Sequence, residues 1–74
     1  MTADTLKKLS TQQEHYLRNL ANTIKIAKTL GHNTIIEQDK ATARGYIRCL
    51  IDCGVITENE FRTLWCWFTE LVNR

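Results

Sequence analysis

Cysteine and histidine are the residue types in this chain that could bind a metal ion. Cys49 and Cys53 are four positions apart, which places them one turn apart on a helix. Cys66, His15 or His32 could complete a tetrahedral zinc site with them. Structural zinc sites typically use closer cysteine pairs, with two residues between the thiols, and small apolar thiols are common along helix flanks. We therefore predict that the chain binds no metal and no cofactor.

Catalysis by these thiols would require more than a nucleophile. A cysteine nucleophile needs a base within hydrogen-bonding distance and usually a third group that orients the base. The sequence contains no pattern that predicts such a triad. The carboxylates Glu58 and Glu60 lie at the expected start of a helix, where the helix dipole favours negative charge. Because 74 residues leave little room for both a core and a substrate pocket, we predict that the protein is not an enzyme.

A strip of cations could instead contact nucleic acid. Lys40, Arg44 and Arg48 follow one another at four-residue intervals, and Lys25 and Lys28 are available from an earlier segment. The formal net charge is only +2, whereas a dedicated nucleic-acid-binding domain is usually strongly basic. Such a strip is more often a solvated helix face. Nucleic acid is therefore the less favoured partner and stays an alternative.

A helix-turn-helix formed by residues 34–53 and 58–73 is the specific form of that alternative. The first turn of its second helix should face base edges and phosphates. That turn contains Glu58 and Glu60, and its one early cation is Arg62. The alternative function is thus a small helix-turn-helix DNA-binding regulator.

The apolar periodicity predicts a long amphipathic helix over about residues 5–30. Gly31 ends it, because glycine tolerates the left-handed backbone that closes a helix. A capping box of Ser10 and Gln13 offers a later start. The residues on one face are Leu6, Leu9, Gln13, Tyr16, Leu17, Leu20, Ile24 and Ala27.

A second helix is predicted over residues 34–53 and ends at Gly54. Thr34 and Glu37 have the spacing of a capping box, and Asp39 is a rival cap. Its apolar face consists of Ile36, Ala43, Ile47, Leu50 and Ile51.

The third predicted helix, residues 58–73, has the clearest start. Thr57 is the cap, Glu60 is the reciprocal residue, and Ile56 can pack against Phe61. Its apolar face consists of Phe61, Leu64, Trp65, Phe68, Leu71 and Val72. The short connection before it predicts an antiparallel helical hairpin.

These elements predict an all-α fold with a single domain over residues 1–74. It is expected to be a three-helix domain, in which the long N-terminal helix packs on the C-terminal hairpin. The order Gly54, Val55, Ile56, Thr57, then Glu60 and Phe61, resembles the SHOCT-type short C-terminal domain over about residues 44–70. That resemblance implies a binding or oligomerisation hairpin, frequent in bacterial and phage proteins, without catalytic residues. The sequence departs from the family pattern at residues 65–68, where aromatic residues and a cysteine replace a lysine-rich surface.

Helix lengths predict a surface for self-association. A continuous helix over residues 5–30 would be about 39 Å long and the third helix about 24 Å. Leu6 and Leu9 would then project beyond the hairpin, and with Gln13 and Tyr16 they have a spacing that suits pairing with a second copy. A homodimer is thus one option.

Binding to another protein has its own candidate residues. Trp67 lies about 60° beyond Leu64 on a helical wheel, at the margin of the core face. It either closes the core beside Ile26 or Leu30, or it is an exposed anchor of the kind that dominates interfaces. The predicted partner-binding residues are Trp67, Tyr46, Arg44, Arg48, Ile26 and Leu30.

The odd number of cysteines and the absence of a signal-like apolar stretch near residue 1 predict reduced thiols in the cytoplasm. The longest apolar run has five residues, at 64–68, so we expect no membrane span. The predicted function is a non-enzymatic protein–protein interaction module, a small regulator or inhibitor of a larger, unidentified protein. By analogy, it would be an accessory protein of a phage or mobile element that acts on a host or defence protein.

Overall fold

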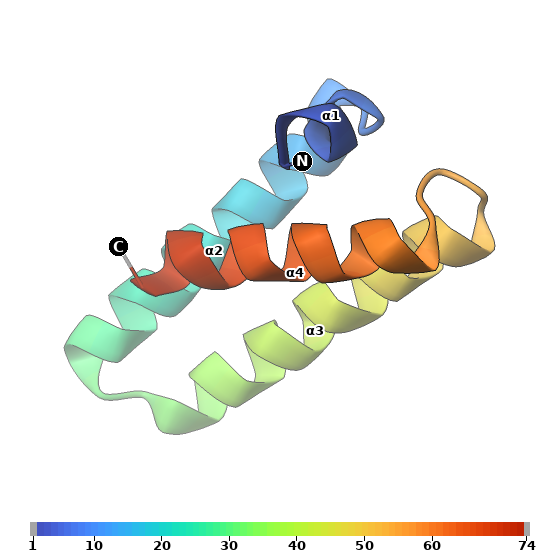
Figure 1. The fold of residues 1–74 in the computed structure, drawn as a ribbon. Helices are drawn as coiled ribbons and strands as arrows, with labels where there is room; N and C mark the ends of the chain where they lie inside the picture. The colour runs from blue at the N-terminus through green and yellow to red at the C-terminus, as the bar shows by residue number, and fades with distance from the viewer. Residues whose placement is uncertain (1, 74) are drawn as a thin grey trace.

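The structure is a computed structural model that describes residues 2–73, and these residues form four helices (Figure 1). The helices are α1 (Thr2–Lys7), α2 (Thr11–Leu30), α3 (Asn33–Asp52) and α4 (Glu58–Asn73). Within residues 2–73 there is no strand, so the prediction of an all-α fold is confirmed. The prediction of three helices is wrong, because the N-terminal segment contains two.

The break in the N-terminal segment lies at Ser10, where the backbone is extended (φ −69°, ψ 162°). The Ser10 hydroxyl accepts a hydrogen bond from the Gln13 N–H at 3.1 Å. In return, the Gln13 side chain accepts one from the Ser10 N–H at 2.8 Å. A serine that caps a new helix in this way interrupts the previous one. The later start is therefore the correct one, and the continuous helix over residues 5–30 is wrong.

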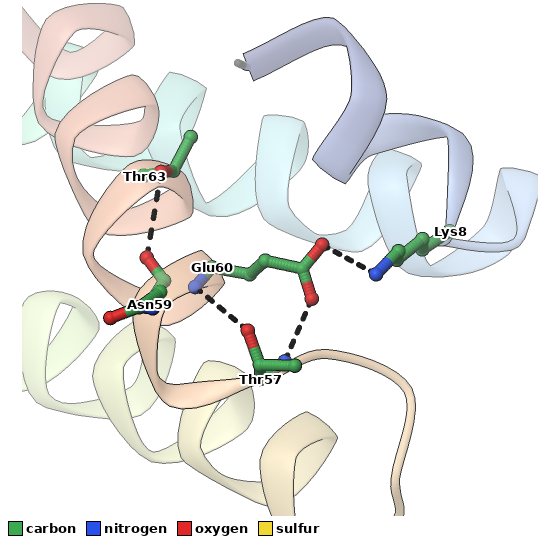
Figure 2. Close-up of polar contacts among 5 residues, drawn as sticks. All are labelled: Lys8, Thr57, Asn59, Glu60 and Thr63. Carbon is green, nitrogen blue, oxygen red and sulfur yellow. Dashed lines mark hydrogen bonds and ion pairs between the residues drawn. The ribbon is translucent and has the colours of Figure 1, made fainter.

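The short helix α1 packs against α4, and Lys8, directly after α1, reaches Glu60 in the first turn of α4 (Figure 2). Leu9, which follows α1, is 8% exposed and belongs to the core, and Leu6 packs partly buried against that core. Thr5 is also buried. The expectation that Leu6 and Leu9 project beyond the hairpin is therefore wrong, because the chain turns at Ser10 and directs them inward.

Two tight turns connect the three long helices. Gly31 has the left-handed conformation expected of it (φ 75°), and the N–H of His32 donates to the Ala27 carbonyl at 2.9 Å. Helix α3 then begins at Asn33, with His32 in the cap position and without a side-chain cap hydrogen bond. The predicted caps at Thr34 and Asp39 are wrong, because the short turn leaves both residues already inside the helix.

The turn between α3 and α4 agrees with the sequence prediction. Gly54 is in the left-handed region (φ 76°), where an L side chain is disfavoured. The Thr57 hydroxyl accepts from the Glu60 N–H at 3.3 Å, and the Glu60 carboxylate accepts from the Thr57 N–H at 2.8 Å (Figure 2). Helix α4 starts directly after the cap residue Thr57, at the predicted residue Glu58.

Helix α2 packs on both α3 and α4, and these three helices enclose one core. Each of the three long helices contributes apolar residues at helical spacing, and Leu9 and Ile56 join the core from the connections between helices. The buried apolar residues are Leu9, Leu17, Ala21, Ile24, Ala27, Ile36, Ala43, Ile47, Leu50, Ile56, Leu64, Trp67, Phe68 and Val72. The sides of α3 and α4 that α2 does not cover are left to form the surface described next.

Candidate interaction surface

Trp67 is a core residue with 7% of its surface exposed. The guanidinium of Arg18, on α2, lies over its ring at 5.3 Å from the ring centroid. Glu14 holds that guanidinium through a 2.9 Å ion pair one turn earlier on α2. Ile26 and Leu30, its other predicted neighbours, are each 62% exposed. Of the two options for Trp67, the structure therefore supports the one in which Trp67 is a core residue. The Arg18 guanidinium covers the part of the Trp67 ring that faces outward.

Tyr46 is half-buried where α2 and α3 meet. Its ring centroid lies 4.5 Å from that of Tyr16, with the planes tilted by 46°. Partial burial, reinforced by the nearby Tyr16 and Cys49, raises the pKa of the Tyr46 hydroxyl above its usual range. Tyr16 is 40% exposed, and its role in self-association stays a prediction, as does that of Gln13. Tyr46 thus belongs to a contact between α2 and α3.

The strip of cations on α3 is exposed and lies beside aromatic residues of α4. Lys40, Arg44 and Arg48 are all exposed. The Arg44 guanidinium carbon lies 5.9 Å from the centroid of the Trp65 ring, within the range of a cation–π contact. Arg48 approaches Glu58 at 3.8 Å, an exposed and weak pairing. Trp65, predicted on the apolar face of α4, is only half-buried.

Three adjoining hollows run along these cations and aromatic rings and share residues with one another. Lys40 and Trp65 line both of the first two hollows, and Ala41 and Arg44 line both the second and the third. We call their combined surface the α3–α4 groove. It is lined on α3 by Glu37, Lys40, Ala41, Arg44, Gly45 and Arg48, and on α4 by Phe61, Trp65, Phe68, Thr69, Val72 and Asn73.

The charge of the groove is positive. Its lining contains three cations and the single carboxylate of Glu37, which leaves an excess of two positive charges. This excess equals the formal net charge of the whole chain. The remaining side chains are therefore balanced overall, and Glu58 partly offsets Arg48 at one end of the groove. Summed charge of this kind attracts ligands of opposite sign.

The α3 wall of the groove is low in its middle because two small residues line it there. Ala41 and Gly45 are one turn apart and both are exposed. A Cβ atom added at Gly45 would meet nothing within 4 Å, so the space above the glycine is open. A second backbone could therefore approach α3 closely between the cations.

Cys49 and Cys53 lie close together at the end of α3. The Cys49 and Cys53 sulfurs are 4.0 Å apart, and both residues are exposed. The shared hydrogen bond with Cys53 is the main reason that the pKa of the Cys49 thiol is raised. Among the residues that the structure describes, no cluster of three potential ligands brings Cys66, His15 or His32 to this pair.

The first turn of α4 is occupied by other parts of the chain. Glu60 forms a 2.6 Å ion pair with Lys8, from the connection after α1, in addition to its cap contacts (Figure 2). The Lys8 ammonium is the largest influence that lowers the pKa of the Glu60 carboxyl, followed by the Thr57 N–H. This arrangement fixes Glu60 as a structural residue and leaves Glu58 exposed beside it.

Comparison with protein-family models, with curated proteins and with solved structures gives no match for this chain. The resemblance over residues 44–70 therefore stays a prediction. Within residues 2–73, no helix combines the length and hydropathy that crossing a membrane requires. The site must be interpreted from its own geometry, in which Arg44 and Arg48 come together while Trp67, Tyr46, Ile26 and Leu30 lie outside the groove lining.

Proposed function

We propose that the protein is a non-enzymatic interaction module, a small helical regulator or inhibitor that binds a larger protein through the α3–α4 groove. One observation supports this proposal above all others. The groove is continuous along two helices, with cations on one wall and half-buried aromatic rings on the other. Arginine and tryptophan are the residues most enriched at the energetic centres of protein interfaces, and Arg44 and Trp65 lie together in the middle of the groove.

The shape of the groove favours a macromolecular partner over a small molecule. The groove is open to solvent along two helices, whereas small-molecule sites are concave and bury most of their ligand. Its exposed cations leave one side polar, as at the rim of a protein interface, and the rings of Phe61 and Trp65 supply the apolar part.

DNA binding through α3 and α4 is the second candidate, and the exposed cations of α3 are the observation in its favour. Against it, the first turn of α4 would have to enter the major groove. Glu58 and Glu60 place negative charge there, and α1 with Lys8 lies beside that turn. We therefore favour a protein partner.

The test compares a blocked groove with an intact one. Gly45→Glu places a carboxylate in the groove, and the open space above Gly45 means that it should not disturb packing. Gln12→Glu changes the charge by the same amount at an exposed position on α2. We expect the wild-type chain and Gln12→Glu to capture the same protein from nuclease-treated lysate, and Gly45→Glu to lose it. A photo-crosslinking residue at Ala41, but not one at Gln12, should join to that protein.

Two results would contradict the proposal. Equal capture by Gly45→Glu and by the wild-type chain would place the contact elsewhere on the molecule. A partner released by nuclease, with binding that falls steeply between about 50 and 200 mM salt, would favour the DNA-binding alternative.

A further inference from the structure

We infer that the α3–α4 groove receives an acidic amphipathic helix of its partner protein, with carboxylates toward α3 and apolar side chains toward α4. This inference rests on the proposed function and specifies the chemistry of the segment that is bound. It is argued from the charge of the groove, the chemistry of its two walls and the hydrogen-bonding state of their backbones.

The α3 wall sets the charge of the occupant. Lys40, Arg44 and Arg48 repeat every four residues, so they are spaced by about 6 Å along α3. Carboxylates at the same four-residue interval on a second helix would meet them in register. Each contact would be a charge-assisted hydrogen bond, the stronger kind in proteins. The wall from Lys40 to Arg48 is about 12 Å long, which corresponds to just over two turns of such a helix.

The α4 wall sets the apolar side of the occupant. Phe61, Trp65 and Val72 line the groove on α4 at intervals of four and seven residues, the spacing of one helix face. Apolar side chains at matching intervals on the occupant would pack between them as ridges into grooves. The occupant must therefore be amphipathic, because its two sides face walls of different chemistry.

The backbone of the occupant should be helical rather than extended. Both walls of the groove are helices, whose backbone groups are hydrogen-bonded within the helix itself. An extended peptide would find no strand edge to pair with and would leave its own N–H and C=O groups unpaired over apolar side chains. A helix satisfies these groups internally. Ala41 and Gly45 provide the low part of the α3 wall over which such a helix could approach.

A single-stranded nucleic acid fits the same surface less well. Base stacking needs an open aromatic face. One face of Trp65 already lies under the Arg44 guanidinium at 5.9 Å, and its ring packs edge-on against Phe68 at 5.7 Å. The observations therefore favour an acidic helix.

The inference is tested with synthetic peptides of about four turns. The acidic peptide has leucines at positions i, i+4, i+7 and i+11 and glutamates along one flank of that stripe. The first control has the same composition in scrambled order, the second has lysines in place of the glutamates, and a single-stranded oligonucleotide of equal charge is the third probe. Binding to the full chain is measured by calorimetry. We expect the acidic helix to bind and the three other probes to bind at least about tenfold more weakly, equivalent to 1.4 kcal/mol.

Matched variants of the chain locate the bound peptide. Arg44→Gln removes a cation of the groove, and Arg62→Gln removes an exposed cation of α4 that does not line the groove. We expect Arg44→Gln to weaken binding of the acidic peptide about tenfold and Arg62→Gln to leave it unchanged. Circular dichroism should show both variants folded, since both side chains are exposed.

Each other outcome overturns the inference in a recognisable way. Equal binding of the scrambled peptide would exclude recognition of a helix face, and equal binding of the lysine peptide would exclude charge recognition. Tighter binding of the oligonucleotide would make nucleic acid the occupant. If no peptide binds while the cellular protein is still captured through Gly45 and Ala41, the proposed function stands and only the acidic helix is wrong.

Discussion

Trp65 and Trp67 are two positions apart on α4, and the structure gives them different roles. Trp67 is 7% exposed beneath Arg18, whereas Trp65 is half-buried beside Arg44 in the groove. We predict that Trp67→Ala lowers the free energy of unfolding by about 3–5 kcal/mol, the usual cost of a large core truncation. Trp65→Ala should instead weaken partner binding by about 2 kcal/mol with a smaller loss of stability. Urea unfolding and binding measured on both variants would separate the roles, and a Trp67→Ala protein of full stability would contradict the burial.

Glu60 couples the start of α4 to Lys8, and this gives stability a pH dependence. The ion pair lowers the folded-state pKa of Glu60, so its stabilisation is present above the ordinary glutamate pKa of about 4.3 and is lost as pH falls through the lowered value. Glu60→Gln keeps an acceptor for the Thr57 N–H but removes the charge. We predict that the wild-type chain is more stable than Glu60→Gln at pH 7 and that the difference disappears near pH 2. Urea unfolding at both pH values measures this, and a constant difference would contradict it.

The Cys49 and Cys53 thiols influence one another through their 4.0 Å contact. The hydrogen bond with Cys53 raises the pKa of Cys49, and only the thiolate is an effective nucleophile. We predict that Cys53→Ala lowers the Cys49 pKa and so speeds its alkylation by iodoacetamide at pH 7 to 8. The exposed Cys66 is the internal control, and its rate should not change. Mass spectrometry measures the alkylation rate of each cysteine. Equal Cys49 alkylation rates in the wild-type chain and in Cys53→Ala would show that the two thiols act independently.

At the scale of the elements, the sequence predicted helix ends better than it predicted where helices pack. Thr57 with Glu60, Gly31 and Gly54 are local signals, because a cap or a left-handed turn depends on a few neighbouring residues. The capping box at Ser10 is also a local signal for a helix start. However, the apolar periodicity continues across Ser10, and this periodicity favoured one continuous helix. Periodicity alone cannot show that the chain reverses there, since the same apolar residues fit one long helix or two short ones.

The groove was missed for a related reason. Arg44 and Arg48 were predicted as binding residues, but the proximity of Arg44 to Trp65 depends on how α3 and α4 are rotated in the hairpin. A helical wheel places Trp65 in the core and Trp67 at its margin. In the structure, α2 and Arg18 cover that margin, so the core is displaced toward Trp67 and leaves Trp65 in the groove. The rotation of one helix against another depends on tertiary packing, so the sequence of a single helix does not predict it.

Helix α1 and the connection that follows it are predicted to stabilise the domain rather than to form a second interface. Leu9 is 8% exposed against the core, and Lys8 pairs with Glu60 of α4. Leu9→Ala should lower the free energy of unfolding by about 2 kcal/mol or more, the cost of a buried leucine truncation. Lys7→Ala, at an exposed neighbouring position, is the matched control and should change it little. Sedimentation of the wild-type and Leu9→Ala proteins would also test the predicted homodimer. If the wild-type chain is a dimer and Leu9→Ala dissociates it without a loss of stability, Leu9 belongs to an interface between copies and not to the core.

At the scale of the whole molecule, the core and the groove use different sides of the same two helices. The core lies where α2 meets α3 and α4, and the groove lies along the outer seam between α3 and α4. A fold of this size has little stability to spare, so a groove residue that lowers stability is informative. Gly45 is such a residue, because it lies in the interior of α3 and leaves an open space above it.

We therefore predict that Gly45 lowers stability and favours binding. Glycine within a helix costs about 0.5–1 kcal/mol relative to alanine, and an added Cβ at Gly45 meets nothing within 4 Å. Gly45→Ala should raise the unfolding temperature by roughly 2–8 °C, as expected for a domain of this size. The same methyl group projects into the groove, so it should weaken partner binding. The reverse change at the neighbouring lining residue, Ala41→Gly, should lower the unfolding temperature without weakening binding. A Gly45→Ala protein that is more stable than the wild-type chain and binds the partner equally tightly would contradict the prediction. It would show that the partner does not approach α3 closely at Gly45, because the added methyl group would not disturb the interface.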